Sequence, residues 1–155
     1  MGKIKKILFC TDFSNNSNWA FSYAVDLAKI YRAFLYIIHV ISKGEYLDHI
    51  SIYIPPDVYK KIEEENERYI NESFKENCLP QLGDYKDYEF IIKQGTPFVE
   101  IIKFAKEKKV DIIMMGTHGK TALTHVLFGS TAENVVRKAP CPVLTIRHPS
   151  KQIDI

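Results

Sequence analysis

Short apolar runs alternate with segments of helical periodicity along the whole chain, and this alternation constrains the fold more than any other feature of the sequence. The runs have the length and composition of strands that are covered on both faces. They occupy residues 6–10, 34–40, 88–92, 111–115 and 142–146. Because parallel neighbours need crossover connections, the order βαβαβαβαβ predicts a single α/β domain, with a five-stranded parallel sheet and helices on both faces.

Amphipathic segments lie between these runs. In residues 15–31, one predicted helix face collects Ala20, Tyr23, Ala24, Leu27 and Ala28. A long charged segment opens at Pro55-Pro56 and ends before Pro80. Its single apolar stripe consists of Ile62, Tyr69, Ile70 and Phe74, which predicts a helix with a wide solvated face. Residues 97–105 and 130–138 predict two further helices.

Length and charge narrow the classes of function. The chain has 155 residues, enough for one domain, which we place at residues 1–148 with a C-terminal tail at 149–155. A formal net charge of +2 argues against nucleic acid or a membrane surface as a partner. No apolar run approaches the ~18 residues of a membrane-spanning helix, so neither membrane insertion nor export is expected.

The cysteines favour a reducing compartment. Cys10, Cys78 and Cys141 are odd in number and far apart, and no Cys-x-x-Cys pair is present to suggest a zinc or redox site. Free cysteines are usually buried, so we expect three buried, reduced thiols and a cytoplasmic location.

The segment from Gly116 to Thr131 carries the strongest functional signal. In open parallel α/β sheets, ligands bind beyond the carboxyl ends of the strands, and this segment follows a predicted strand. Its glycines allow the close backbone approach that a phosphate-binding loop needs. Gly129 and Ser130 stand at the start of a predicted helix, where unpaired N–H groups attract an anion, and Lys120 adds a positive charge at the rim.

This segment has two alternative interpretations besides phosphate binding. Ser130 with Glu133 forms a capping-box pattern, which would satisfy the helix start without any ligand. The run Gly119-Lys120-Thr121 looks like the end of a P-loop, but that motif requires glycine at position 114, where the chain has Met114. The P-loop reading is therefore rejected.

The spacing resembles the Gly-x2-Gly-x9-Gly-Ser/Thr signature of ATP-binding universal stress proteins. Gly116, Gly119, Gly129 and Ser130 match it in order. Further matches extend over nearly the whole chain: Thr11-Asp12-Phe13-Ser14, His39-Val40, Gly95-Thr96-Pro97, and Ala139-Pro140-Cys141-Pro142. The resemblance implies a Rossmann-like three-layer fold of the adenine nucleotide alpha hydrolase type, and ATP as the ligand with Mg²⁺ or Mn²⁺ accompanying its phosphates.

The resemblance also implies a role for each candidate site residue. Asp12 would accept hydrogen bonds from the ribose hydroxyls, Val40 would contact adenine, and Cys10 would line the same pocket where relatives often have proline or a small residue. The ribose and α-phosphate would lie over Met115, Gly116, His118 and Gly119. The β- and γ-phosphates would be held by Gly129, Ser130 and Thr131. His118 and His125, taken alone, are expected to face solvent.

Three hypotheses for the function follow. The first is an ATP-binding regulatory module of a stress response, acting on a signalling partner. The second is a slow ATPase or nucleotidyl-transfer enzyme; no acid pair at the glycine loop is suited to hold Mg²⁺, and we assign no catalytic or metal-ligating residue. The third is a dimeric scaffold that binds no nucleotide. In the family, an apolar last strand pairs with its twin, so the 142–146 strand predicts a homodimer.

Overall fold

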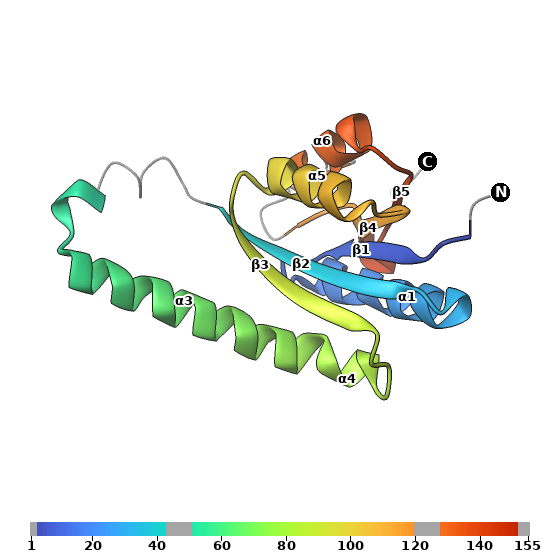
Figure 1. Cartoon of the computed structure of the whole chain (residues 1–155), viewed down its shortest axis with the longest axis horizontal. Helices are drawn as coiled ribbons and strands as arrows, with labels where there is room; N and C mark the ends of the chain where they lie inside the picture. Colours follow the sequence, from blue (N-terminus) through green and yellow to red (C-terminus); the bar gives the residue numbers. More distant parts are fainter. Residues whose placement is uncertain (1–2, 43–50, 120–127, 152–155) are drawn as a thin grey trace.

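The computed structural model describes residues 3–42, 51–119 and 128–151, and it confirms the predicted α/β architecture (Figure 1). Five parallel strands form one sheet in the order β3-β2-β1-β4-β5. The strands are β1 (Lys6–Cys10), β2 (Phe34–Ser42), β3 (Tyr88–Gly95), β4 (Ile112–Gly116) and β5 (Val143–Ile146). The helices are α1 (Asn15–Tyr31), α3 (Pro56–Asn77), α4 (Leu79–Leu82), α5 (Pro97–Lys108) and α6 (Ser130–Lys138), with 3₁₀ turns η1 (Ser51–Tyr53) and η2 (Pro149–Lys151).

The boundaries of β1, α1 and α6 agree with the sequence prediction, whereas β2 and β3 run further than their apolar patterns indicate. These two strands pair from Leu35 with Tyr88 to Ser42 with Gly95. Near the end of this pairing, β3 contributes the polar residues Lys93 and Gln94, which lie opposite Val40 and Ile41. Because β3 is the last strand on its side, these side chains reach solvent while the backbone ladder continues.

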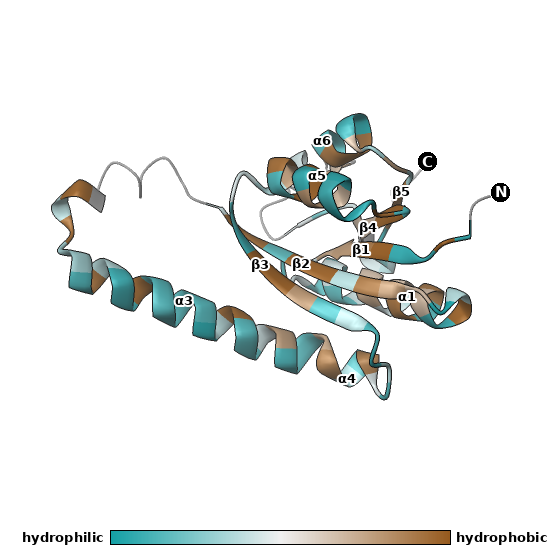
Figure 2. Ribbon diagram, viewed as in Figure 1, coloured by the Kyte–Doolittle hydropathy of each residue, from teal (hydrophilic) through white to brown (hydrophobic). Residues whose placement is uncertain are grey.

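Two hydrophobic cores cover the two faces of the sheet. One packs α1 and the end of α3 against β1 and β2, and Phe9, Phe21 and Phe74 are among its buried residues. The other packs α5 and α6 against the opposite face, through residues such as Ile101 and Val135. Figure 2 shows the strands as largely hydrophobic ribbons between the two helix layers. The fold is therefore three-layered.

Helix α1 is fixed at both ends by local chemistry. The Ser14 hydroxyl accepts a hydrogen bond from the Ser17 N–H at 3.2 Å, which caps the first turn. Arg32 ends the helix in the left-handed region, at φ 52°. The predicted inward face is correct for Ala20, Ala24 and Ala28, but Tyr23 is 48% exposed. Phe21 and Val25 face the core instead of Tyr23, because the buried face of α1 extends to the other side of the row formed by Ala20, Ala24 and Ala28.

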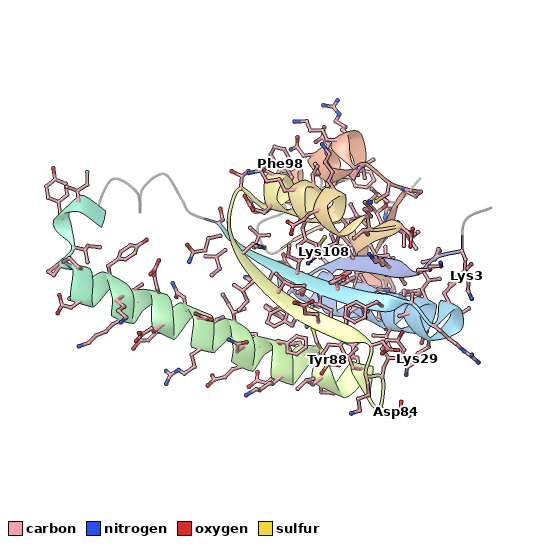
Figure 3. The ribbon with its side chains drawn as sticks, viewed as in Figure 1. Lys3, Lys29, Asp84, Tyr88, Phe98 and Lys108 are labelled. Carbon is pink, nitrogen blue, oxygen red and sulfur yellow. The ribbon has the colours of Figure 1, made fainter. Side chains whose placement is uncertain are left out.

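The predicted apolar stripe of helix α3 is only partly buried in the structure. Ile70 and Phe74 are buried, and Phe74 lies 6.2 Å from the ring of Tyr88, which Figure 3 labels on β3. Ile62 and Tyr69 are 42% and 63% exposed. For Ile62 the physical reason is length: the helix continues past the sheet, so its N-terminal half has no core to contact (Figure 1). Tyr69 lies in the C-terminal half, but about 100° around the helix from the buried Ile70. The described part of the chain contains no helix long and apolar enough to cross a membrane.

The prediction that the cysteines are buried is confirmed for two of the three. Cys10 and Cys78 are buried, whereas Cys141 is half-buried, so the prediction is wrong there. Burial raises the pKa of the Cys78 thiol to about 12, so this thiol stays protonated at neutral pH. All three cysteines are free in the structure.

Substitution of Phe9 tests the core beneath α1. Phe9 is fully buried and its ring lies 5.0 Å from that of Phe21. Phe9→Ala leaves a cavity and is expected to lower the free energy of unfolding by about 3–5 kcal/mol. The matched control, Ile30→Ala, removes a side chain that is 75% exposed and should change stability by less than about 0.5 kcal/mol. Equal denaturant midpoints for the two variants would contradict this packing.

Candidate functional site

A cleft of about 700 Å³ opens at the carboxyl ends of the strands. The chain leaves β1 for β2 and β3 on one side, and later returns to β4 and β5 on the other. The connections that follow β1 and β4 therefore diverge, and the space between them is where doubly wound sheets bind ligands. The cleft lies at this reversal of strand order, as the sequence predicts.

The structure brings the predicted site residues together from four separate segments. All of those that lie within the described residues line the cleft: Cys10, Asp12, Val40, Met115, Gly116, His118, Gly119, Gly129, Ser130 and Thr131. Lys120 and His125 lie outside the described residues. The sequence spacing therefore corresponds to one continuous surface.

The loop after β1 is held in place by its own hydrogen bonds. Thr11 Oγ1 accepts from the Phe13 N–H at 3.0 Å and from the Ser17 hydroxyl at 2.9 Å. Nδ1 of His39 lies 2.9 Å from the Thr11 carbonyl oxygen, and because a carbonyl only accepts, this nitrogen carries the hydrogen. Phe13 adopts φ 60° and stacks on the His39 ring. Strained backbone of this kind often occurs at binding sites.

Asp12 and Gly119 approach each other across the cleft. Asp12 Oδ1 accepts from the Ser14 N–H at 3.0 Å, which orients the carboxylate. A Cβ atom on Gly119 would lie 2.6 Å from Asp12 Oδ2, closer than any ordinary contact. Glycine at 119 is therefore required for this position of the carboxylate, a relation that the sequence does not reveal.

The two ends of the glycine loop are tied together. The Gly129 N–H donates to the Thr117 carbonyl at 2.8 Å, and the Thr117 N–H donates to the Ile146 carbonyl at 3.1 Å. His118 is only 7% exposed, so the expectation that it faces solvent is wrong. Its Nδ1 lies 2.8 Å from Thr117 Oγ1, and its carbonyl accepts from the Asn16 amide at 3.4 Å. These contacts fold the residue into the cleft wall.

The start of α6 has no side-chain cap. Its N-cap residue is Gly129, at φ −65° and ψ 157°, and no side-chain hydrogen bond caps the helix within the described residues. The capping-box reading is wrong, because Ser130 lies inside the helix instead of at its N-cap. Glu133 instead makes an ion pair with Arg137 at 3.9 Å. The first N–H groups of α6 thus face the cleft beside the hydroxyl-bearing residues Ser130 and Thr131.

Apolar and sulfur groups form the floor of the cleft at the strand ends. Cys10, Val40 and Met115 come from three adjacent strands, β1, β2 and β4. Burial, with a smaller contribution from Cys141, raises the pKa of the Cys10 thiol well above its usual range. Cys10 therefore contributes a neutral, weakly polar surface instead of a nucleophile.

The helices that flank the cleft also contribute residues to it, which the sequence did not predict. Asn66, Tyr69 and Ile70 from α3, and Pro97 and Ile101 from α5, also line it. Pro97 belongs to the Gly95-Thr96-Pro97 motif that matches the family, so a signal for α5 was present in the sequence. The α3 residues carry no local signal, because only tertiary structure brings that helix alongside the strand ends.

The described residues contain no group of three or more His, Cys, Asp or Glu side chains suited to hold a metal ion. Asp12 is the one carboxylate among the residues that line the described cleft. Electrostatic complementarity to an anion comes instead from backbone amides and hydroxyl groups.

Comparison with known proteins places the chain in a family. The model of the universal stress protein family matches residues 3–147. The chain is 35% identical to universal stress protein MJ0531 of Methanocaldococcus jannaschii, over 96% of this chain and 85% of that protein. The solved structure of MJ0577, a universal stress protein of the same organism, is 33% identical, with a TM-score of 0.75 over 95% of this chain and 98% of that one.

Two less similar solved structures share the fold. One is a universal stress protein in complex with cAMP, with 23% identity, a TM-score of 0.60 and coverage of 94% of this chain and 98% of that one. The other comes from Archaeoglobus fulgidus and is in complex with dAMP, with 18% identity, a TM-score of 0.65 and coverage of 93% and 98%. By the match of its full domain and by the identity of its relatives, the chain belongs to the universal stress protein family.

Proposed function

We propose that this protein binds ATP in the cleft and acts in the cytoplasm as a nucleotide-dependent regulatory module of a stress response. The observation that carries the proposal is the uncapped start of α6, which faces a 700 Å³ cleft together with two hydroxyl-bearing residues. A cleft of this size suits a nucleotide. A helix start without a side-chain cap leaves N–H groups that require an acceptor.

The phosphate chain is assigned to the α6 end of the cleft. The N–H groups of Ser130 and Thr131 and the two hydroxyl groups supply donors to phosphate oxygens, and the positive end of the helix dipole adds a favourable field. Gly129 allows the phosphates to approach the backbone closely. The hydrogen bond from its N–H to Thr117 holds this turn in place without the ligand.

The nucleoside is assigned to the β1 and β2 side. Asp12, oriented by the Ser14 N–H, accepts from the ribose hydroxyls, and Val40 contacts the base at the end of β2. The cAMP and dAMP complexes of two other proteins of this fold support an adenine nucleotide as the ligand class. Mg²⁺ or Mn²⁺ would be held chiefly by the phosphate oxygens, since a single carboxylate lines the described cleft.

The nucleotide that copurifies with the protein distinguishes the three hypotheses. Protein purified without added nucleotide is denatured, and the supernatant is analysed by chromatography. Stoichiometric ATP supports the regulatory module. ADP that accumulates with time favours a slow ATPase, and the absence of nucleotide even after incubation with excess ATP favours a scaffold. We expect ATP, because the cleft presents donors for phosphate but no paired acids for efficient turnover.

Gly129→Val tests the assignment of the phosphates. The backbone at Gly129 has an ordinary φ of −65°, and a Cβ there would meet its nearest atoms at 3.6 Å, so the fold should survive. The branched side chain would occupy the space in front of the helix amides. We expect titration calorimetry to detect no ATP binding.

The control for this substitution is Gly129→Ala, which adds only the Cβ atom and should weaken binding less. Thermal unfolding verifies that both variants are folded. Undiminished ATP affinity in a folded Gly129→Val protein would show that the phosphates lie elsewhere.

Asp12→Ala tests the ribose contact. Loss of a hydrogen bond to a charged acceptor is expected to weaken ATP binding by about 1–3 kcal/mol. Gly119→Ala should also weaken it, because the new Cβ atom displaces the Asp12 carboxylate. Asp26→Ala removes an exposed acid of α1 and serves as the control. An unchanged ATP dissociation constant in Asp12→Ala would count against the assignment.

We further propose that β5 pairs with its twin in a homodimer. β5 is the last strand on its side of the described sheet. Pro142 and Ile146 direct their carbonyl groups to β4, so the alternate residues Val143 and Thr145 direct their backbone groups to the open edge. Leu144, 41% exposed, adds apolar surface beside that edge.

Thr145→Pro removes a donor from the open edge without removing one from the bonds to β4. We expect it to reduce the mass in solution from that of two 17.9 kDa chains to that of one, as measured by light scattering. Thr145→Val keeps the N–H group and should remain dimeric. A dimeric Thr145→Pro variant would place the interface elsewhere.

A further inference from the structure

We propose that Asn66 and Tyr69 of α3 form the wall against which the nucleotide base lies, and that this helix selects adenine over guanine. The inference rests on the proposed nucleotide site and adds to it a determinant of base specificity. Both residues line the cleft, although α3 lies in a different layer from α6.

The strand order determines the order in which the site residues lie along the cleft. The α6 start lies on the β4 side, Asp12 follows β1, Val40 lies two residues before the end of β2, and α3 borders the cleft beyond them. Neighbouring strands are about 4.8 Å apart, so the α6 start and α3 are separated by several strand spacings. A ligand with phosphates at α6 and ribose at Asp12 therefore directs its base toward α3.

The charges on α3 near Asn66 support this direction. Within three residues of Asn66, the helix carries four acids and one base, so the local charge disfavours phosphate; these are Glu63, Glu64, Glu65, Glu67 and Arg68. The N-terminus of α3 at Pro56 is ten residues away, or about 15 Å along the helix, so its dipole offers no anion site at Asn66. The α3 end suits the uncharged part of the nucleotide.

The side chains at this end match a purine in chemistry. The Tyr69 ring offers a flat surface for stacking, and it lies at the cleft while remaining 63% exposed. An asparagine amide presents one donor and one acceptor, the pattern that pairs with the N7 acceptor and N6 donor of adenine. Guanine presents two acceptors at the equivalent edge, so one of its pairs with the amide would be lost.

The structure gives these two residues no visible role in the core. The buried residues of α3 are Ile70, Ser73 and Phe74, all C-terminal to Tyr69. Asn66 and Tyr69 are themselves exposed. Truncation of Asn66 or Tyr69 should therefore leave the fold intact, which makes them suitable for a binding test.

The experiment measures dissociation constants of ATP and GTP by titration calorimetry for the native chain, Asn66→Ala and Tyr69→Ala. Tyr53→Ala removes a tyrosine that is 84% exposed and does not line the cleft, and Asn71→Ala removes an α3 amide that does not line it. These are the matched controls. Thermal unfolding confirms that all variants are folded.

We expect Tyr69→Ala to weaken ATP binding by roughly 5- to 150-fold, the range found when an aromatic platform for a base is removed. Asn66→Ala should reduce the preference for ATP over GTP, and both control variants should bind as the native chain does.

The proposal is overturned if both cleft variants keep the native ATP affinity and the native ATP-to-GTP ratio, or if the native chain binds the two nucleotides equally. In either case, loss of ATP binding in Gly129→Val would leave the proposed function standing. A native chain that binds no ATP would overturn both.

Discussion

The reversal of strand order at β1 is the constraint on which the rest of the structure depends. Because β2 and β4 lie on opposite sides of β1, the connections after β1 and β4 separate at the carboxyl edge and leave a cleft between them. The same arrangement brings the Thr11–Ser14 loop, the end of β2 and the start of α6 within reach of one ligand. Residues more than a hundred positions apart, such as Asp12 and Gly119, meet only because of it.

Much of the fold and of the candidate site could be predicted from the sequence, for physical reasons that differ between elements. The boundaries of α1 are local, since Ser14 caps its first turn and Arg32 ends it. The predicted site residues lie at the carboxyl ends of strands, in the loops that follow them or at the start of a helix, so they share one edge of the sheet. The family resemblance identified these residues individually, whereas periodicity alone could only indicate the loops in which they lie.

The parts that the sequence did not reveal depend on contacts between distant segments. The buried His118 contacts Thr117 and also Asn16, which is 102 positions away in the sequence. Within the described residues, α6 has no side-chain cap because Gly129 is its N-cap residue. The sequence pattern of Ser130 and Glu133 instead suggests a capping box. Tyr69 stays exposed because it lies about 100° around α3 from the buried Ile70, and the packing of Phe74 against β3 brings this helix alongside the sheet.

The central claim is that the first amides of α6 bind a polyphosphate. A crystal structure of the protein grown with excess ATP tests it most directly. The account predicts phosphate oxygens within hydrogen-bonding distance of the N–H groups of Ser130 and Thr131, with the ribose beside Asp12. If the start of α6 were empty in such a crystal, or covered by atoms of the protein itself, the account would be contradicted.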